Sequence, residues 1–218
     1  MEVYLNEQLG KVTYEIDDTP TSSAVLILAH GAGAGMHHPF LNTLAKQICD
    51  EGVSVVRFNF PYMEKGRKAP GSPKDAILCW EKIILETKKL FHDKDLFISG
   101  KSYGGRMASH LLAVNHDLKV SGIIYYGFPL HAPGRDSTER AAHLGVIEVP
   151  QLFIQGNKDK LANIQLMRKV TTELQLASMI EMENGDHSFK TPKSFASQEE
   201  TMRKLSKISI EWINKNSD

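Results

Sequence analysis

The stretch Leu96–His110 reads LFISGKSYGGRMASH and places Ser102 between glycines at positions 100 and 104. An apolar run precedes the serine, and a segment with helical spacing follows it. This is the pattern G-x-S-x-G in the context of a strand, a sharp turn and a helix. Such a turn strains the serine backbone, and flanking glycines let strand and helix approach without a side-chain clash. We therefore expect the Ser102 hydroxyl to project above a sheet edge, beside a helix N-terminus that favours negative charge.

Two other glycine-rich motifs, both of which bind phosphate groups, could explain these turns. The spacing of the glycines excludes both motifs. A phosphate-binding loop ending in Gly100, Lys101 and Ser102 would need glycine at position 95, where the chain has Asp95. A dinucleotide fingerprint in the earlier run GAGAG would need glycine in place of Met36 or His38. We therefore expect no nucleotide cofactor.

Short aliphatic runs alternate with segments of helical spacing along most of the chain. Their apolar residues are consecutive, which is typical of strands buried on both faces. The expected strands lie in the runs SAVLILA, VSVVRFNF, DLFISG, SGIIYYG and VPQLFIQG, with a weaker one at ASMIEM. The N-terminal EVYLN and KVTYEID could add antiparallel edge strands. This alternation predicts an α/β fold, with helices on both faces of a mostly parallel sheet and ligands at the carboxyl ends of its strands.

Helix signals fall between these strands. Residues 38–52 close on Gly52, and a second helix opens with Ser72 as N-cap and Pro73 in its first turn. A third helix follows Ser102, and residues 198–216 predict a terminal amphipathic helix. Neither repeats nor a composition shift divide the chain, so we expect one domain over residues 1–218 with little or no cap.

Composition limits the classes of partner. Lys plus Arg and Asp plus Glu number 26 each, so no long-range field gathers nucleic acid or anionic membranes. Two cysteines outside any Cys-x-x-Cys spacing indicate a reducing compartment, and neither a signal peptide nor a membrane span is recognised. We expect a cytoplasmic protein that binds a small molecule, with neither nucleic acid nor membrane as partner; its oligomeric state stays open.

A serine nucleophile needs a base and an acid that orients the base. In this fold the chain order is nucleophile, acid, base. His187, just past the last expected strand, is our candidate base, and Asp159, four residues past a strand, is the candidate acid. Asp136, on an earlier loop, is a rival acid, whereas Asp186 adjoins the histidine and would have to fold back on it.

Two backbone N–H groups must face the oxyanion that acyl transfer develops. The residue after the nucleophile, Tyr103, supplies one donor. The loop after the first core strand supplies the second, with Ala32 the first choice and Gly33 the next. His30, at the end of that strand, is interpreted as a loop-bracing hydrogen-bond partner rather than a proton carrier.

Two irregular stretches, Pro61–Pro73 and Gly127–Pro150, follow expected strands and could shape the pocket, although solvated connections would look the same. Within them Arg67 and His131 are candidate substrate-binding residues, together with Gly33. Lys101 is expected to be exposed. The adjacent His37 and His38 have no further ligand at metal-binding spacing, so we expect no metal.

The motifs HGAGAG, GKSYGG, QGNKD and GDHSF, in this order, resemble the α/β-hydrolase superfamily over nearly the whole chain. More narrowly, the chain resembles a small dienelactone-hydrolase-related branch that includes an animal testis-expressed protein and a subunit of a chromatin acetyltransferase complex. The resemblance implies Ser102, Asp159 and His187 as triad residues, with Ala32 and Tyr103 at the oxyanion. It implies a serine hydrolase of small acyl esters or thioesters. A non-catalytic binding or scaffold protein on the same fold is the alternative.

Overall fold

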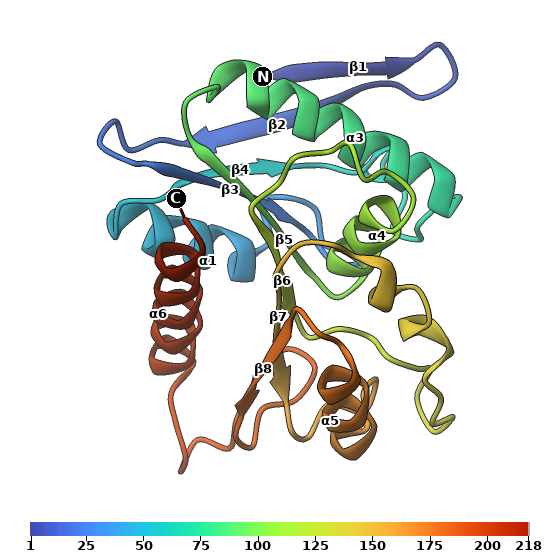
Figure 1. The fold of residues 1–218 in the computed structure, drawn as a ribbon, viewed down its shortest axis with the longest axis vertical. Coiled ribbons are helices and arrows are strands. Elements are labelled where there is room, and N and C mark those ends of the chain that lie inside the picture. Colours follow the sequence, from blue (N-terminus) through green and yellow to red (C-terminus); the bar gives the residue numbers. More distant parts are fainter. Residues whose placement is uncertain (218) are drawn as a thin grey trace.

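An eight-stranded sheet with the order β1-β2-β4-β3-β5-β6-β7-β8 organises the chain in the computed structural model, which describes residues 1–217 (Figure 1). The strands are β1 (Glu2–Asn6), β2 (Gly10–Asp17), β3 (Ala24–Ala29), β4 (Ser54–Phe58), β5 (Asp95–Lys101), β6 (Gly122–Tyr126), β7 (Gln151–Gly156) and β8 (Ala177–Met182). β1 and β2 pair antiparallel, β2 also joins β4 antiparallel, and the other neighbours are parallel. The mostly parallel sheet and its antiparallel edge confirm the predicted fold class.

Helices cover both faces of the sheet. They are α1 (Pro39–Asp50), α2 (Pro61–Glu64), α3 (Pro73–Leu90), α4 (Tyr103–Leu112), α5 (Ile164–Glu173) and α6 (Gln198–Asn216), with short 3-10 turns η1 (Glu139–Ala141) and η2 (Leu144–Val146). In Figure 1, α1 and α6 lie on one side of the sheet, and α3, α4 and α5 on the other. A single sheet therefore shares its two faces between two sets of helices.

The two faces have separate cores because successive side chains of a buried strand point in opposite directions. In β3, Val25 and Ile27 join the core under α3, α4 and α5, whereas Leu26 and Leu28 join the core under α1 and α6. Trp80 is fully buried in the first of these cores. Consecutive apolar residues in the sequence are thus the mark of a strand covered on both sides.

Local capping explains where the helices begin. Ser72 caps α3 by accepting a hydrogen bond from the backbone N–H of Lys74, as the sequence predicted. At α6, Ser197 and Glu200 form a reciprocal capping box. α5 goes beyond the elements that the sequence pattern predicted. Its buried Met167 and Val170 lie three positions apart, and Asn163 caps it by accepting a hydrogen bond from the backbone N–H of Gln165, so the sequence did carry a helix signal here.

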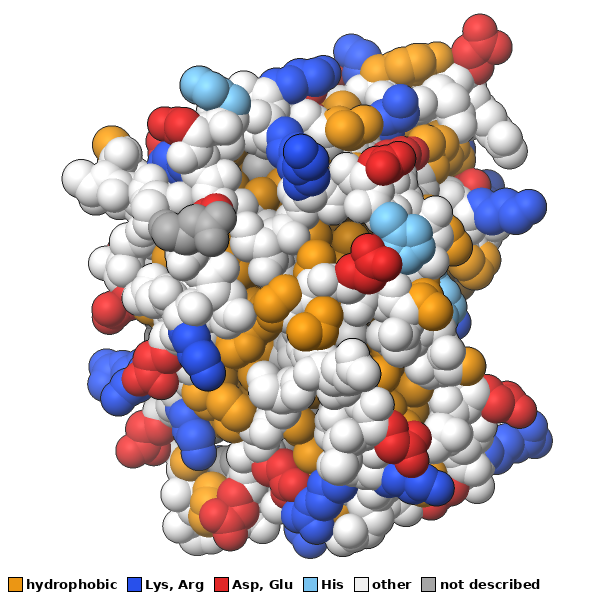
Figure 2. All heavy atoms as spheres, in the orientation of Figure 1, with side chains coloured by type: hydrophobic (Ala, Val, Ile, Leu, Met, Phe, Trp, Pro, Cys, Tyr) orange, Lys and Arg blue, Asp and Glu red, His pale blue; other side chains and the backbone are white. Residues whose placement is uncertain are grey.

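Charged side chains of both signs are interspersed over the face shown in Figure 2. This distribution agrees with the equal numbers of acidic and basic residues in the sequence. Many ion pairs join exposed partners, such as Lys46 with Asp50 and Arg203 with Glu199. Exposed pairs of this kind each add little to stability.

A histidine pair joins the 127–150 segment to α4. The Nε2 atom of His143 lies 2.7 Å from the hydroxyl oxygen of Ser109, and its ring stacks on His110 at 3.8 Å between centroids. Burial, followed by the charges of His110 and Arg106, lowers the pKa of His143 to about 4. His143 is therefore neutral in the folded protein at pH 7.

We predict that acid weakens the fold partly through His143. Between pH 6.5 and about 4, His143 is protonated in the unfolded chain but stays neutral in the folded protein. The free energy of unfolding therefore decreases as the pH falls through this window. Replacing His143 with Gln should make the free energy of unfolding less dependent on pH in this window. The slope should change by less than the ~1.4 kcal/mol per pH unit expected for one fully buried group. Urea unfolding at several pH values measures this, with His116→Gln, an exposed histidine, as control. Equal slopes in wild type and His143→Gln would contradict the prediction.

Candidate active site

Ser102 occupies a strained turn between β5 and α4. Its backbone has φ 50° and ψ −111°, and φ in the positive range is disfavoured for any residue with a side chain. The turn is possible because Gly100 packs directly against the backbone of Gly104 and Gly105, where a Cβ atom on Gly100 would lie 2.2 Å from the Gly105 nitrogen. The two glycines of the motif thus permit the contact between strand and helix that exposes the serine.

Three side chains that are distant in the sequence form one hydrogen-bonded chain. The Nε2 atom of His187 lies 2.8 Å from the hydroxyl oxygen of Ser102, and its Nδ1 atom lies 2.7 Å from Oδ2 of Asp159. Because a carboxylate only accepts, the Nδ1 atom carries the proton and Nε2 is left to accept from the serine. The Asp159 side chain is fully buried, and that of His187 is 25% exposed. The imidazole therefore joins a buried carboxylate to a reachable hydroxyl.

Further donors fix the Asp159 carboxylate. The backbone N–H of Leu161 donates to Oδ1 at 2.7 Å, and the side-chain amide of Gln155 donates to Oδ2 at 2.7 Å. Gln155 is not among the site residues predicted from the sequence, although a glutamine inside the apolar run LFIQG is a signal of a polar partner nearby. These donors hold the carboxylate so that Oδ2 faces the imidazole.

The loop that carries His187 has a strained backbone of its own. Asn184 and Phe189 on either side both have positive φ, of 56° and 59°. Asp186 accepts backbone hydrogen bonds from Ser188 and Lys190 through Oδ1 and so closes the turn. Asp186 therefore shapes the loop, as its place beside His187 suggested, and does not contact the imidazole as an orienting acid.

Lys101 differs from the sequence prediction that it is exposed. Its ammonium donates a hydrogen bond to the backbone carbonyl of His187 at 2.6 Å. It also lies 5.5 Å from the centre of the Phe189 ring. Burial lowers the pKa of Lys101 to about 8, although Asp159 and Asp186 oppose this shift. The residue before the serine thus points inward, toward the loop of the histidine.

Backbone donors are free where the oxyanion hole is expected. Within residues 1–217 the N–H groups of Ala32 and Tyr103 have no hydrogen-bond acceptor. The N–H of Gly33, by contrast, donates to the hydroxyl of Tyr62 at 3.2 Å. Ala32 therefore fits the role of second donor, and Gly33 does not.

His30 braces this loop from beneath. Its Nδ1 atom bonds the carbonyl of Gly31 at 2.7 Å, and its Nε2 atom accepts from the backbone N–H of Phe60 at 3.1 Å. The ring is fully buried, and burial lowers its pKa to about 4. The neutral imidazole donates through Nδ1 and accepts through Nε2, so it supports the loop and is not placed to act as a proton carrier, in line with the sequence interpretation.

A cleft of about 610 Å³ opens beside Ser102 and His187. It extends from the loop after β3 to the start of α1, the loop after β8 and the first turn of α6. Its apolar lining consists of Ala32, Ala34, Pro39, Phe40, Leu41, Leu161 and Met202. The opening thus faces the side of the sheet that α1 and α6 cover.

This direction corrects the expectation about the two irregular stretches. None of the residues 61–73 or 127–150 lines the cleft. Arg67 is exposed outside it, and Gly33 also stands apart from the lining. The 61–73 stretch packs behind the β3–α1 loop, where Tyr62 meets Gly33 and the carbonyl of Lys68 would lie 3.2 Å from a Cβ on that glycine. It supports the cleft wall from outside.

His131 is likewise a structural residue in this geometry. It is 4% exposed, its Nδ1 atom bonds the carbonyl of Ala132, and its Nε2 atom accepts from the backbone N–H of Asn163 at 2.7 Å. Asp136, the rival acid, bonds the side chain of Asn163 and lies 3.4 Å from His131. Both residues fasten the 127–150 segment to the start of α5, which leaves Asp159 as the partner of His187.

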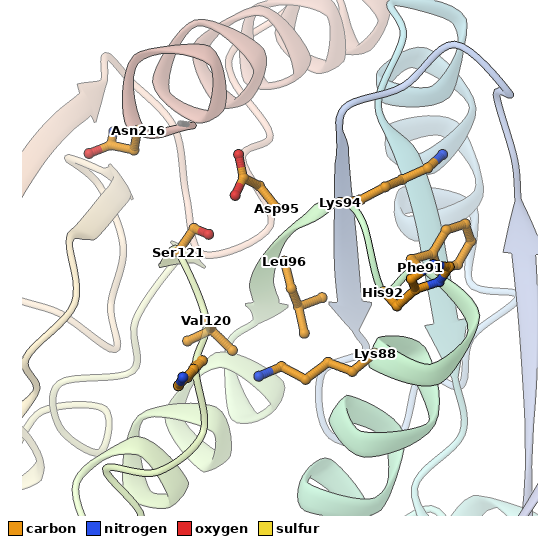
Figure 3. A pocket seen from close by; sticks show the side chains of 10 residues that line it. Lys88, Phe91, His92, Lys94, Asp95, Leu96, Val120, Ser121 and Asn216 are labelled. Atoms are coloured by element: carbon orange, nitrogen blue, oxygen red, sulfur yellow. The ribbon is translucent and has the colours of Figure 1, made fainter.

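A second hollow of about 540 Å³ lies at the opposite ends of the strands, where β5 and β6 begin (Figure 3). Its lining includes Lys88, Lys94 and Asp95, and also Ser121 and His92. Figure 3 shows His92 and Ser121 on opposite sides of the hollow, so they form no dyad. The carboxyl ends of the strands, not this edge, carry the hydrogen-bonded serine.

Residues 1–217 contain neither a cluster of metal ligands nor a helix suited to span a membrane. No three His, Cys, Asp or Glu side chains gather there in a way that could hold a metal ion. No helix in that range combines the length and the apolar character that crossing a membrane requires.

An α/β sheet with a serine turn, a histidine loop and a buried aspartate defines the class of this protein. The model of the alpha/beta hydrolase domain family matches residues 22–214, and the chain belongs to that family. Within it, the narrower resemblance to the branch with the testis-expressed protein stays a prediction.

Solved structures share the fold at low sequence identity. An alpha-beta serine hydrolase homologue from Coxiella burnetii has 18% identity and a TM-score of 0.76, and the match covers 98% of this chain and 97% of that one. A dienelactone hydrolase from Anabaena variabilis has 16% identity and a TM-score of 0.77, covering 100% and 97%. A serine hydrolase without lid from Xanthomonas campestris has 17% identity and a TM-score of 0.71, covering 99% and 94%.

We predict that Gly104→Ala destabilises the protein at the serine turn. A Cβ at this position would lie 2.6 Å from the carbonyl oxygen of His30 and 2.9 Å from the Ala29 side chain. Overpacking of a close backbone contact costs about 1–3 kcal/mol. Thermal unfolding measures the loss. Gly71→Ala is the matched control, because its Cβ meets only the Asp75 carboxylate at an ordinary 3.5 Å. Unchanged melting of Gly104→Ala would refute the close packing described here.

Proposed function

We propose that this protein is a serine hydrolase that cleaves small acyl esters or thioesters through a covalent acyl-enzyme. The observation that carries the proposal is the continuous hydrogen-bonded chain from Ser102 through His187 to Asp159. Its order along the sequence is the nucleophile, acid, base order of the α/β-hydrolase fold. Family membership and the backbone donors beside Ser102 support the same reaction class.

In the first half of the proposed reaction, the Ser102 oxygen attacks the acyl carbon and His187 takes the hydroxyl proton on Nε2. Asp159 keeps the Nδ1 proton in place and stabilises the imidazolium that forms. The carbonyl oxygen becomes an oxyanion, which the N–H groups of Ala32 and Tyr103 stabilise at the N-terminus of α4. His187 then gives its proton to the departing alcohol or thiol, and an ester of Ser102 remains.

In the second half, water replaces the leaving group. His187 removes a proton from the water molecule as the water oxygen attacks the acyl carbon. A second oxyanion forms, and the same two N–H groups stabilise it. Collapse of this intermediate returns the proton from His187 to the Ser102 oxygen and releases the carboxylic acid. The same three side chains thus serve both steps, with no cofactor in the scheme.

The lining of the cleft supports an apolar acyl group. Phe40 on α1 and Met202 on α6 belong to the same cleft as Ser102, and Phe40 stacks on Phe189 with ring centres 6.0 Å apart. Burial of an acyl chain there contributes about 0.8 kcal/mol per CH₂ group. The volume of about 610 Å³ leaves room for chains longer than acetyl.

We predict that Ser102→Ala abolishes hydrolysis of 4-nitrophenyl acetate and modification by a fluorophosphonate. Asp159→Asn should lower kcat by roughly 10⁴-fold, because the amide favours the wrong imidazole tautomer. Steady-state kinetics and mass spectrometry of the labelled protein measure both effects, and circular dichroism checks that each variant folds.

Asp136→Asn is the matched control, since Asp136 bonds Asn163 and His131 away from Ser102. Wild-type turnover in that variant, beside the loss in Asp159→Asn, would assign the acid. Folded wild-type protein that neither labels nor turns over ester would instead favour a binding or scaffold role on this fold.

We also predict that Met202→Trp shortens the preferred acyl chain. The larger side chain would fill the cleft toward α6, so hydrolysis of octanoyl ester should fall roughly 10-fold or more relative to acetyl ester, the range expected for loss of a few methylenes in an apolar pocket. A panel of 4-nitrophenyl esters from acetyl to decanoyl measures kcat/KM. An unchanged chain-length profile in Met202→Trp would place the acyl group elsewhere.

A further inference from the structure

Lys101 is a partly buried cation at the cleft that the proposed reaction does not use. It ends β5 and directly precedes Ser102, so it occupies the variable position of the motif G-x-S-x-G. Within residues 1–217 its ammonium has no carboxylate within 4 Å, and its hydrogen bond goes to the backbone carbonyl of His187 at 2.6 Å. A charge that is partly withdrawn from water is stabilised by a polar partner, and here a peptide carbonyl is that partner.

The fold leaves room for this bond. Gly127, just past β6, has φ 70°, and a Cβ atom there would lie 3.2 Å from the Lys101 nitrogen and 3.4 Å from the His187 carbonyl oxygen. The Phe189 ring lies over the ammonium from the same loop as the histidine. Gly127 and Phe189 thus enclose the contact between the residue before the serine and the backbone of the histidine.

We propose that Lys101 is a positioning residue that ties the His187 loop to the serine turn and so keeps the imidazole at the Ser102 hydroxyl. This role rests on the proposed hydrolase function. The loop needs such a tie because it carries two residues with positive φ, Asn184 and Phe189, and its own turn is closed by Asp186 within the loop. Asp159 orients the ring of His187 from one side, and Lys101 holds its backbone from the other.

The charge of Lys101 strengthens the tie. Hydrogen bonds from an ionised donor are roughly twice as strong as neutral ones. The groups that face the ammonium are Asp159 from the β7–α5 loop and Asp186 and His187 from the β8–α6 loop. Since burial lowers the pKa of Lys101 to about 8, the ammonium is mostly charged at pH 7 and loses its charge in mildly alkaline solution.

The test compares wild type with Lys101→Met and Lys101→Arg, with 4-nitrophenyl acetate as substrate and a fluorophosphonate as label. Lys101→Met should lower kcat on the order of 10- to 100-fold, the effect of a small misplacement of a reacting group. Because Lys101 also lines the cleft, the split between kcat and KM is decisive: positioning of the base predicts that the loss falls on kcat, and a loss confined to KM would overturn the proposal. Lys101→Arg keeps a cation at the carbonyl and should recover most of this loss. Lys158→Met, an exposed lysine beside Asp159, is the matched control.

The pH profile separates positioning from a general loss of structure. Wild-type kcat should decline above pH about 8, as the ammonium loses its charge. Lys101→Arg should keep its activity through this range, and Lys101→Met should lack the decline. Should Lys101→Met fail to fold, the comparison of wild type with Lys101→Arg still decides, since the same decline in both would overturn the proposal.

Two further outcomes overturn it: wild-type kcat in folded Lys101→Met, or folded Lys101→Arg as impaired as folded Lys101→Met. Each leaves the hydrolase function standing, because wild type still labels at Ser102. Wild-type protein that neither labels nor turns over the ester would instead refute the function on which the proposal rests.

Discussion

The close approach of β5 to α4 is the contact on which the site depends. Gly100 lies against the backbone of Gly104 and Gly105, with no space for a Cβ atom between them. This contact shortens the connection to one residue, so Ser102 takes positive φ and its hydroxyl leaves the sheet at the edge where the helix begins. Strain of about 1–3 kcal/mol at one residue persists only where the surrounding packing holds it. Here β5 lies inside the sheet, paired in parallel with β3 and β6 and buried on both faces.

Parallel pairing brings the other groups to the same edge. The loop with Ala32 follows β3, Asp159 follows β7 and His187 follows β8, so each extends from the carboxyl end of its strand. Distances of 2.7 and 2.8 Å join residues that are 28 and 85 positions apart in the chain. A register shift of one residue in any of these strands would move a donor or acceptor out of reach, since it turns every side chain to the other face.

Hydrogen bonds fix single orientations for the polar groups that position the site. His30 uses both ring nitrogens to hold the β3–α1 loop, and Gln155 and Leu161 hold the carboxylate of Asp159. The N–H groups of Ala32 and Tyr103 are left without an acceptor within residues 1–217. Unpaired donors at a helix start, beside an apolar cleft, are suited to an anion that forms only during reaction.

The sequence by itself determined the fold class, the strand order in the chain and the three polar residues at strand ends. Consecutive apolar residues mark strands buried on both faces, and G-x-S-x-G has few structural uses, so local pattern was sufficient for these. It also predicted Ser72 as a cap and the N-terminal segments as possible antiparallel edge strands; of these β1 forms the edge, whereas β2 lies between β1 and β4. The sequence pattern did not predict α5 or the four-residue α2, although the N-cap Asn163 and the buried Met167 and Val170 at helical spacing mark α5.

Only the tertiary structure decided which side of the sheet the cleft faces and what Lys101 and His131 contact. Both loops that follow expected strands could have framed the pocket, yet α1 and α6 line it, because the β3–α1 and β8–α6 loops meet on their face. His131 accepts a hydrogen bond from the backbone N–H of residue 163, and Lys101 donates one to the backbone carbonyl of residue 187. Such partners are far apart in the sequence and come within a few ångströms only when the chain folds. A local sequence pattern therefore cannot predict these contacts.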